Sequence, residues 1–396
     1  MNLSTKAGCW VTDVAYSVIP PRGIDLQFAF LQFHTFGLDV LGKGIKPGLN
    51  RNDAYGLSIA LPPFNEQRRI VAKVDELMLL CDQLEQETES SIDAHKTLVE
   101  TLLTTLTNST DSTSMAENWA RISEHFDTLF TTEHSIDQLK QTVLQLAVMG
   151  KLVPQDPTDE PASVLLERIA AEKAQLVKDK KIKKQKTLPP ITDEEKPFGL
   201  PDGWEWCRIF DVAELITSGS RDWAKYYSDT GAIFVTMGNL SRGHYNLRMD
   251  NIRYVSPPES GEGSRTKLVE HDLLISITGD VGNLGLIPED FGDAYINQHT
   301  CLLRLMPELH NRYIPEVIRS PLAKYQFDAP QRGIKNSFRL SDVGEVLIPI
   351  PPINEHTRIV SKIDGLMLLC DQLKTQIKQA HRTQLSLADT IVKQTI

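Results

Sequence analysis

The stretch "LPPFNEQRRIVAKVDELMLLCDQLEQ", which begins at Leu61, returns as "IPPINEHTRIVSKIDGLMLLCDQLKT" from Ile350, 289 positions later. Each copy opens on a proline pair and then continues as a long segment without another proline. Proline fixes φ and lacks an amide donor, so such a pair suits an extended lead into a helix. The sequence therefore predicts the same helix twice, with Asn65 and Asn354 at the N-cap positions.

Apolar residues recur along each copy at alternating steps of four and three, which is the pattern of a helix that packs against another helix. We expect each helix to run for about 40 residues, or roughly 60 Å, and the simplest partner for one seam is the other copy. His95 and Gln384 share an equivalent seam position, where a polar layer is either tolerated or fixes the register. The seam residues are Ile70, Val74, Leu77, Cys81 and Leu84 in the first copy and Ile359, Ile363, Leu366, Cys370 and Leu373 in the second.

Between the two copies, helical patterns alternate with polar segments. Residues Thr107–Ser114 predict a loop, and Ser135–Met149 predicts an amphipathic helix that has Ser135 as N-cap and stops at Gly150. A second helix is predicted over Ala162–Val177. It runs into the basic stretch Lys178–Lys186, which is either a solvated helix end or a phosphate contact.

The sequence changes character after this linker. Short apolar runs separated by Gly, Asp and Asn are typical of strands, and they predict a mixed α/β domain before the second copy. Trp204 and Trp206 are interpreted as packing residues at its first strand. The clearest strand candidates are Ala232–Met237, Leu273–Thr278 and Cys301–Met306.

Composition narrows the setting of this chain of 396 residues. Its net charge of −10 disfavours DNA binding through bulk charge, although a local basic groove remains compatible with it. No run of eighteen apolar residues suggests a membrane span, and the first residues lack the pattern of a signal peptide. The five cysteines are scattered, without a CxxC pair, so we expect no zinc site and a reducing cytoplasm.

Catalytic signatures are missing from the sequence. It has no GxxxxGK[ST] loop, no HExxH and no GxSxG. The "LPPF" at Leu61 differs by one residue from the Asn/Asp-Pro-Pro-aromatic motif of amino-methyltransferases, but leucine cannot accept a hydrogen bond from an exocyclic amine. A standalone DNA adenine methyltransferase is therefore the weaker alternative, and we expect neither a catalytic residue nor a metal in this chain.

Several segments together resemble a known family. "LPDGWEWCRIFDVAELITSGS", "GAIFVTMGNL", "HDLLISITGDVGN" and "INQHTCLLRL" look like a target-recognition domain of the specificity subunits of type I restriction-modification enzymes. The region "FTTEHSIDQLKQTVLQLAVMGKLVPQDPTDEPASVLLERIAAEKAQL" is similar to the centre of those subunits. The repeated helix starts strengthen the resemblance, which covers most of the chain from about Gly42.

The resemblance implies an α+β fold in which two antiparallel coiled-coil helices join mixed α/β recognition domains. Each domain would read half of a split site in double-stranded DNA, and the helices would set the spacing. Two modification (methyltransferase) subunits and the restriction subunits would be partners. They would bind the S-adenosylmethionine, ATP and magnesium, and this chain would bind no cofactor.

This resemblance divides the chain into four parts. They are a remnant of a first recognition domain (1–61), a central conserved region (62–197), a complete recognition domain (198–349) and a conserved C-terminal helix (350–396). The first recognition domain is expected to be truncated, because its globular part is much shorter than that of the second copy. Two alternatives follow from a truncation: the subunit is non-functional, or it pairs with a second copy of itself and reads two identical half-sites.

Polar, basic and aromatic side chains on loops are the candidates for DNA contact, because base edges are read by polar groups and phosphates are held by Lys and Arg. The first cluster is Ser218, Ser220, Arg221, Lys225, Tyr226 and Tyr227, the second is Arg242, His244 and Tyr245, and the third is Gln331, Arg332, Lys335, Asn336 and Ser337. The alternative for each is a solvated surface residue.

Overall fold

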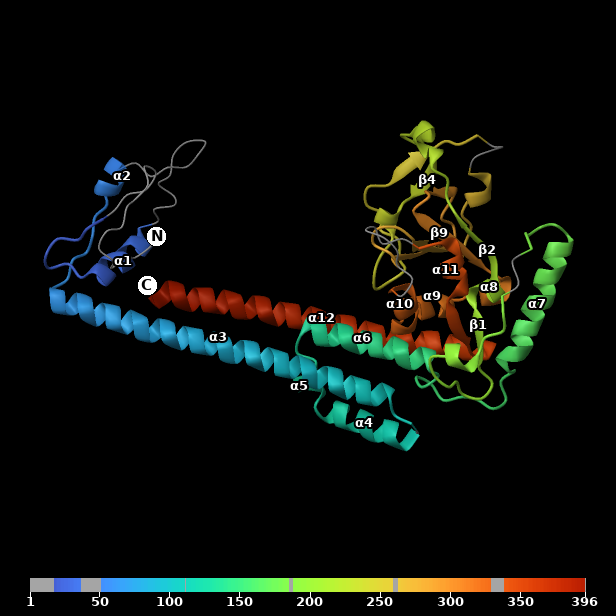
Figure 1. Ribbon diagram of the computed structural model, residues 1–396, viewed down its shortest axis with the longest axis horizontal. Helices are drawn as coiled ribbons and strands as arrows, with labels where there is room; N and C mark the ends of the chain where they lie inside the picture. Colours follow the sequence, from blue (N-terminus) through green and yellow to red (C-terminus); the bar gives the residue numbers. More distant parts are fainter. Residues whose placement is uncertain are drawn as a thin grey trace. The chain divides into compact units, whose positions relative to one another are not determined.

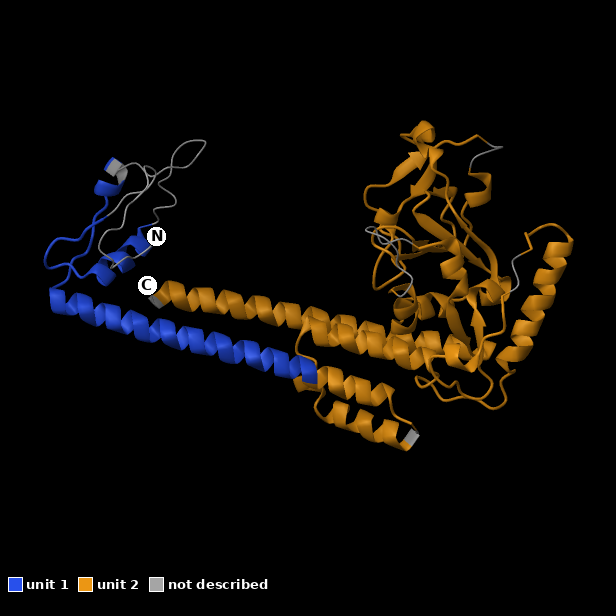
Figure 2. Cartoon of the chain, in the orientation of Figure 1, with its two compact units in different colours: residues 1–97 blue, residues 98–396 orange. Residues whose placement is uncertain are grey.

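The computed structural model describes residues 18–36, 51–110, 112–184, 188–258, 263–328 and 338–395. The chain divides into two compact units, residues 1–97 and 98–396 (Figure 2). The division falls inside the long helix α3 (Phe64–Thr107), whose last turns belong to the second unit.

The first unit joins the short helices α1 (Leu26–Thr35) and α2 (Arg51–Tyr55) to the start of α3. The Asp25 carboxylate caps α1, because its Oδ1 accepts hydrogen bonds from the backbone amides of Gln27 and Phe28 at 3.0 and 3.1 Å. The side chain of Gln67 is buried. Its Oε1 accepts a hydrogen bond from the backbone N–H of Asp25 at 2.8 Å, and its Nε2 donates one to Pro62 O at 2.9 Å. One side chain of α3 therefore fastens the start of α1 to the proline pair.

The second unit contains the mixed α/β domain (Figure 1). Two four-stranded sheets have the orders β2-β9-β6-β7 and β3-β5-β4-β8, and β1 pairs with β10. All pairs are antiparallel except β4 with β8. The strands are β1 (Glu205–Arg208), β2 (Ala213–Ser218), β3 (Tyr227–Ser228), β4 (Ala232–Val235), β5 (Arg253–Val255), β6 (Leu273–Ser276), β7 (Leu284–Leu286), β8 (Ala294–Ile296), β9 (Thr300–Leu305) and β10 (Leu347–Ile350).

Helices surround these sheets and extend from them. The predicted long helices are confirmed in length, with 44 residues in α3 and 43 in α12 (Ile353–Thr395). The other helices of the second unit are α4 (Ser112–Glu124), α5 (Phe126–Leu129), α6 (Glu133–Val148), α7 (Ala162–Lys178), α8 (Ile209–Val212), α9 (Tyr313–Arg319), α10 (Pro321–Asp328) and α11 (Leu340–Glu345). No helix in the described residues is both long and apolar enough to span a bilayer.

The seam of α12 is covered inside the second unit. Ile359 and Ile363 belong to the core of the mixed domain, together with residues of α6, α7 and α9. Cys370 lies in a helical core with residues from the end of α3, from α5 and from α6. Lys374 adds an ion pair to Asp137 of α6 at 2.8 Å. The partner of the first half of this seam is therefore α6 and the domain, which the repeat alone did not indicate.

The seam of α3 has a different environment. Leu77, Cys81 and Leu84 are exposed, and Ile70 and Val74 are half-buried. In the second unit, Leu102 near the end of α3 packs against the same helical core as Leu373 of α12. The full-length contact between the two copies stays a prediction.

Several expected boundaries need correction. The long helices begin one residue before the expected N-caps, because the second proline of each pair supplies the first acceptor: Glu66 N donates to Pro63 O at 2.8 Å, and Glu355 N to Pro352 O at 2.9 Å. Asn65 and Asn354 therefore lie in the first helical turn. Ser135 is likewise inside α6, and Thr132 is its N-cap in a capping box.

Other boundaries agree with the pattern more closely. The expected loop at 107–114 is shorter than predicted at its carboxyl end, because α4 already begins at Ser112. Gly150 does end α6, with φ of +68°. The helix predicted over Ala162–Val177 extends one residue further, and the end of the basic run after it lies outside the described residues.

Candidate nucleic-acid interface

Three strand ends meet at one edge of the first sheet. Ser218 at the end of β2 pairs with Cys301 at the start of β9, which pairs with Ile275 near the end of β6. The turn Asn297–His299, between β8 and β9, lies at this edge, since Gly219 N donates to Asn297 O at 3.1 Å. A Cβ atom on Gly219 would lie 2.0 Å from Ile296 O, so only glycine permits this approach. We call this surface the strand-end edge.

The loop Ser241–Arg248 joins the strand-end edge through Arg242. Its guanidinium forms an ion pair with Asp280, which follows β6, and donates to Val281 O at 3.1 Å. Arg242 and His244 are exposed. The fold thus brings the start of the first predicted cluster, Ser218 and Ser220, to the same edge as the second predicted cluster.

The sequence suggested that Tyr245 lies on the surface and contacts DNA. The structure places it in the core instead, with only 8% of its surface exposed. Its hydroxyl donates to Glu316 of α9 at 2.9 Å, and burial raises the pKa of Tyr245. Burial also raises the pKa of Glu316, although Arg319 pairs with this carboxyl at 2.6 Å. The tyrosine therefore holds the loop in place and does not face solvent.

The same contacts tie the loop to the long helix. Arg319 donates to Gly243 O, while Arg312 donates to the Tyr245 hydroxyl at 3.3 Å. Arg312 also pairs with Asp364 of α12, with one N–O distance of 3.1 Å. The Ser241–Arg248 loop, α9 and α12 are thus connected by charged and polar side chains.

The rest of the first predicted cluster lies in a short 3-10 helix, Asp222–Tyr226, and at the start of β3 in the second sheet, which follows it directly. Lys225 Nζ is 5.0 Å from the centre of the Tyr226 ring, and Tyr227 is exposed. The Arg253 guanidinium of β5 lies 5.9 Å from the centre of the Tyr227 ring. Trp223, beneath them, is buried against Phe234.

Sequence reasoning missed part of this surface. Arg253 lies on a strand too short to show a period, so nothing in its neighbourhood marked it. Asn297, Gln298 and His299 carried a usable signal, since polar residues between two strands predict a turn. The third predicted cluster lies outside the described residues, and its contact with DNA stays a prediction, as it does for the remaining residues of the first two.

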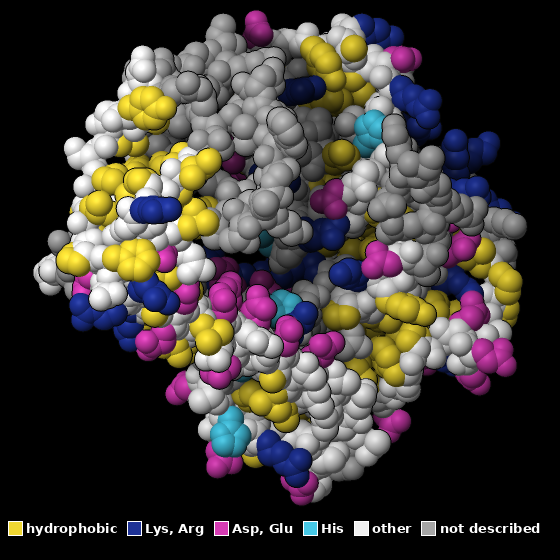
Figure 3. Space-filling view, turned by 60° about the vertical axis from the view of Figure 1, so that its left-hand side comes forward, with side chains coloured by type: hydrophobic (Ala, Val, Ile, Leu, Met, Phe, Trp, Pro, Cys, Tyr) yellow, Lys and Arg dark blue, Asp and Glu magenta, His cyan; other side chains and the backbone are white. Residues whose placement is uncertain are grey.

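Charge is distributed in small groups. On the face shown in Figure 3, Lys and Arg side chains are interspersed with Asp and Glu. This agrees with the net charge of −10 and favours local contacts over attraction by a uniformly basic face. Among the described residues, no group of three or more His, Cys, Asp and Glu side chains is placed to hold a metal ion.

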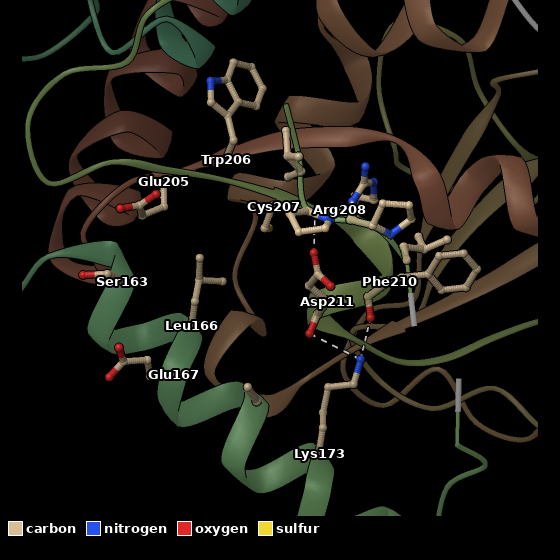
Figure 4. A pocket seen from close by; sticks show the side chains of 15 residues that line it. Ser163, Leu166, Glu167, Lys173, Glu205, Trp206, Cys207, Arg208, Phe210 and Asp211 are labelled. Carbon is tan, nitrogen blue, oxygen red and sulfur yellow. Dashed lines mark hydrogen bonds between the residues drawn. The ribbon is translucent and has the colours of Figure 1, made fainter. Parts of the chain in front are cut away.

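A separate cavity of about 720 Å³ lies between α7 and the β1–α8 segment (Figure 4). Its two basic side chains, Lys173 and Arg208, hold α7 and the linker in place. Lys173 Nζ donates to Phe210 O at 2.5 Å, and burial lowers the pKa of this amine. Arg208 donates to Pro189 O at 2.6 Å and to Glu195 at 3.1 Å. These contacts assign Lys173 and Arg208 to packing.

Known proteins show the same sequence features. Residues 201–380 match the family described as the type I restriction modification DNA specificity domain, a range that spans the mixed domain and much of α12. The specificity subunit of the type I restriction enzyme EcoAI of Escherichia coli is 46% identical over 341 residues, which are 84% of this chain and 57% of that protein. The EcoEI specificity subunit of the same organism is 41% identical over 391 residues, 93% of this chain and 64% of that protein.

A chain in a solved structure of a type I R-M system has a TM-score of 0.49 and 19% identity, and covers 93% of this chain and 67% of its own length. The chain spans less than two thirds of the length of the two E. coli relatives. In identity and extent of the match, the chain is thus similar to the specificity subunits of type I restriction-modification enzymes.

Proposed function

We propose that this chain is the DNA-recognition and scaffold subunit of a type I restriction-modification complex, and that it performs no catalysis itself. The observation that carries the proposal is the strand-end edge. It presents polar side chains from several segments within the domain that matches the DNA specificity family. The domain at residues 198–349 would read one part of a split site in double-stranded DNA.

The long helices suit the scaffold role. A helix of 43 residues extends from the mixed domain and is held to it by a buried seam and ion pairs. Such an element can set the distance between the DNA-reading domain and a second reading surface. Two modification subunits and the restriction subunits are the proposed protein partners, and a second copy of this chain is a further candidate.

Cofactors would belong to the partners. S-adenosylmethionine, ATP and magnesium would serve adenine methylation and DNA cleavage in the modification and restriction subunits, and this chain would bind none of them. We place the complex in the cytoplasm, where the DNA is.

The test is co-expression of the full chain with the modification subunit of the same system, followed by mapping of methylated adenines in the host DNA. A split motif methylated at defined adenines supports the proposal, and two identical inverted halves would add pairing of two chains. A stable complex that methylates no motif contradicts it. Binding of S-adenosylmethionine by the isolated chain would favour a methyltransferase instead.

The basic residues of the 3-10 helix that precedes β3 give a second test. The double variant Arg221→Ala, Lys225→Ala should weaken DNA binding by the assembled complex, because it removes two positive charges from the proposed surface. Unchanged affinity and methylation would remove this 3-10 segment from the interface.

A further inference from the structure

The turn Asn297–His299 holds a side chain with the hydrogen-bonding groups to read a base. Gln298 and His299 are half-buried at the strand-end edge, next to Ser218 and Ser220. Neither belongs to the three clusters that the sequence suggested. The turn also lies beside the end of β6, because Ile277 N donates to His299 O at 3.0 Å.

The backbone of this turn is fixed from several directions. The Asn297 side chain accepts hydrogen bonds from His299 N at 3.1 Å and from Thr300 Oγ1 at 3.2 Å. The Asn297 carbonyl accepts from Gly219 N at 3.1 Å. A side chain carried on such a turn is held close to one position before any ligand arrives, as precise recognition requires.

The Gln298 amide keeps one donor and one acceptor available. Its Nε2 lies 2.8 Å from His299 Nε2, a contact that uses one of its two hydrogens when the imidazole nitrogen accepts. Within the described part of the chain, Gln298 Oε1 accepts no hydrogen bond. One N–H beside one carbonyl oxygen matches adenine in the major groove, where N7 accepts and the N6 amino group donates.

We propose that Gln298 reads an adenine through its major-groove edge and that His299 is a positioning residue for the Gln298 amide. This inference rests on the proposed DNA-recognition function and adds the base class and the residue that selects it. The competing explanation is structural: Gln298 would only orient His299 and fill the edge of the sheet.

The experiment uses the full chain co-expressed with its modification subunit, and compares methylated motifs for the wild type, Gln298→Ala and Gln298→Glu. The alanine variant should lose about tenfold or more of its preference at one A·T pair of the motif, and keep its preference elsewhere. Glutamate only accepts, and therefore matches the cytosine N4 amino group. Gln298→Glu should shift the preference at that same pair toward C·G.

Controls separate reading from folding. Gln175→Ala removes an exposed glutamine of α7 that bonds Asp179 and should leave the motif unchanged. His299→Ala should weaken the preference at the same pair as Gln298→Ala and at no other. Thermal melting of each complex shows whether the variants fold.

The outcomes are distinct. A shift confined to one base pair in both Gln298 variants supports the inference. A motif identical to that of the wild type in both variants overturns it and leaves the DNA-recognition function intact. Unfolding of both variants, or folded variants that methylate all sites uniformly less, also overturns it, because Gln298 would then be structural. A wild-type complex without any motif overturns the proposed function itself.

Discussion

The first halves of α3 and α12 carry nearly the same sequence in different surroundings. The segment "LMLLCDQL" is identical at Leu77–Leu84 and Leu366–Leu373. Cys81 in the first copy is exposed, whereas its equivalent Cys370 in the second copy is only 3% exposed. The seam of the second copy is covered because α6 and the mixed domain pack against it within its own unit. The sequence of a helix face indicates which residues can be buried. Whether they are buried depends on the other segments of the unit that pack against that face.

Despite this difference in burial, the first turns of α3 and α12 share one arrangement of a buried polar side chain. Gln67 and His356 occupy equivalent positions, and both are buried. Gln67 Nε2 donates to Pro62 O at 2.9 Å, and His356 Nε2 lies 3.1 Å from Pro351 O, the equivalent carbonyl. His356 Nδ1 also lies 3.3 Å from Asn311 Oδ1, which accepts from the first amide of α9 at 2.9 Å. Each long helix thus fastens the start of a shorter helix to its proline pair.

The largest difference between the two long helices is expected when the equivalent isoleucines, Ile70 of α3 and Ile359 of α12, are each truncated to alanine. Ile359→Ala should lower the free energy of unfolding of the second unit by about 2–5 kcal/mol, since Ile359 is fully buried and the change leaves a cavity. Ile70→Ala, in the half-buried equivalent, should cost clearly less. Chemical denaturation followed by circular dichroism measures both. Equal losses would show that α3 is covered as completely as α12.

A pH effect should distinguish the two buried polar residues. Burial lowers the pKa of His356 to about 4, so the folded state resists a proton that the unfolded chain takes up near pH 6.5. The stabilising effect of the neutral imidazole is complete above pH 6.5 and is lost as the pH falls toward 4. The loss is roughly 3 kcal/mol over this range.

The matched variant is His356→Gln, which places the first copy's residue in the second copy. It should keep the bond to Pro351 O and flatten the fall in stability between pH 7 and pH 4. Gln67→His should introduce the same fall in the first unit. Denaturation curves at several pH values test both. A wild type and His356→Gln with parallel pH profiles would contradict the assignment.

The sequence predicted the repeated elements better than their surroundings. The helix lengths followed from the periodicity of apolar residues, and the strand candidates followed from short apolar runs separated by Gly, Asp and Asn. The structure confirms both. The cover over Ile359 and Cys370 could not be predicted, because it comes from segments distant in the sequence. Tyr245 failed as a site residue for the same reason: its partner Glu316 lies 71 positions away. Asn297–His299 was visible as a turn, but its place at the strand-end edge depends on strand order.

The reactivity of the two equivalent cysteine thiols should also reflect the difference in burial between α3 and α12, with a smaller effect. Cys81 is exposed, while Cys370 is buried and burial raises the pKa of its thiol. Alkylation requires an accessible thiolate, so Cys370 should react at least about tenfold more slowly than Cys81 in the native chain. Timed alkylation followed by peptide mass spectrometry gives both rates. Similar rates in the native chain and equal rates after denaturation would mean that α12 separates readily from α6.

The smallest effect is expected at an equivalent pair of aspartates. Asp364 of α12 pairs with Arg312, whereas no ion pair of Asp75 of α3 is found among the described residues. Both partners of the Arg312 pair are nearly half exposed, so solvent screens it, and Asp364→Asn should cost no more than about 1 kcal/mol. Asp75→Asn should cost nothing measurable, and the difference should shrink in high salt. A double-mutant cycle with Arg312→Gln isolates the pair. A coupling that persists in high salt would show that the two hydrogen bonds of the pair, and not only its charges, hold Arg312 to α12.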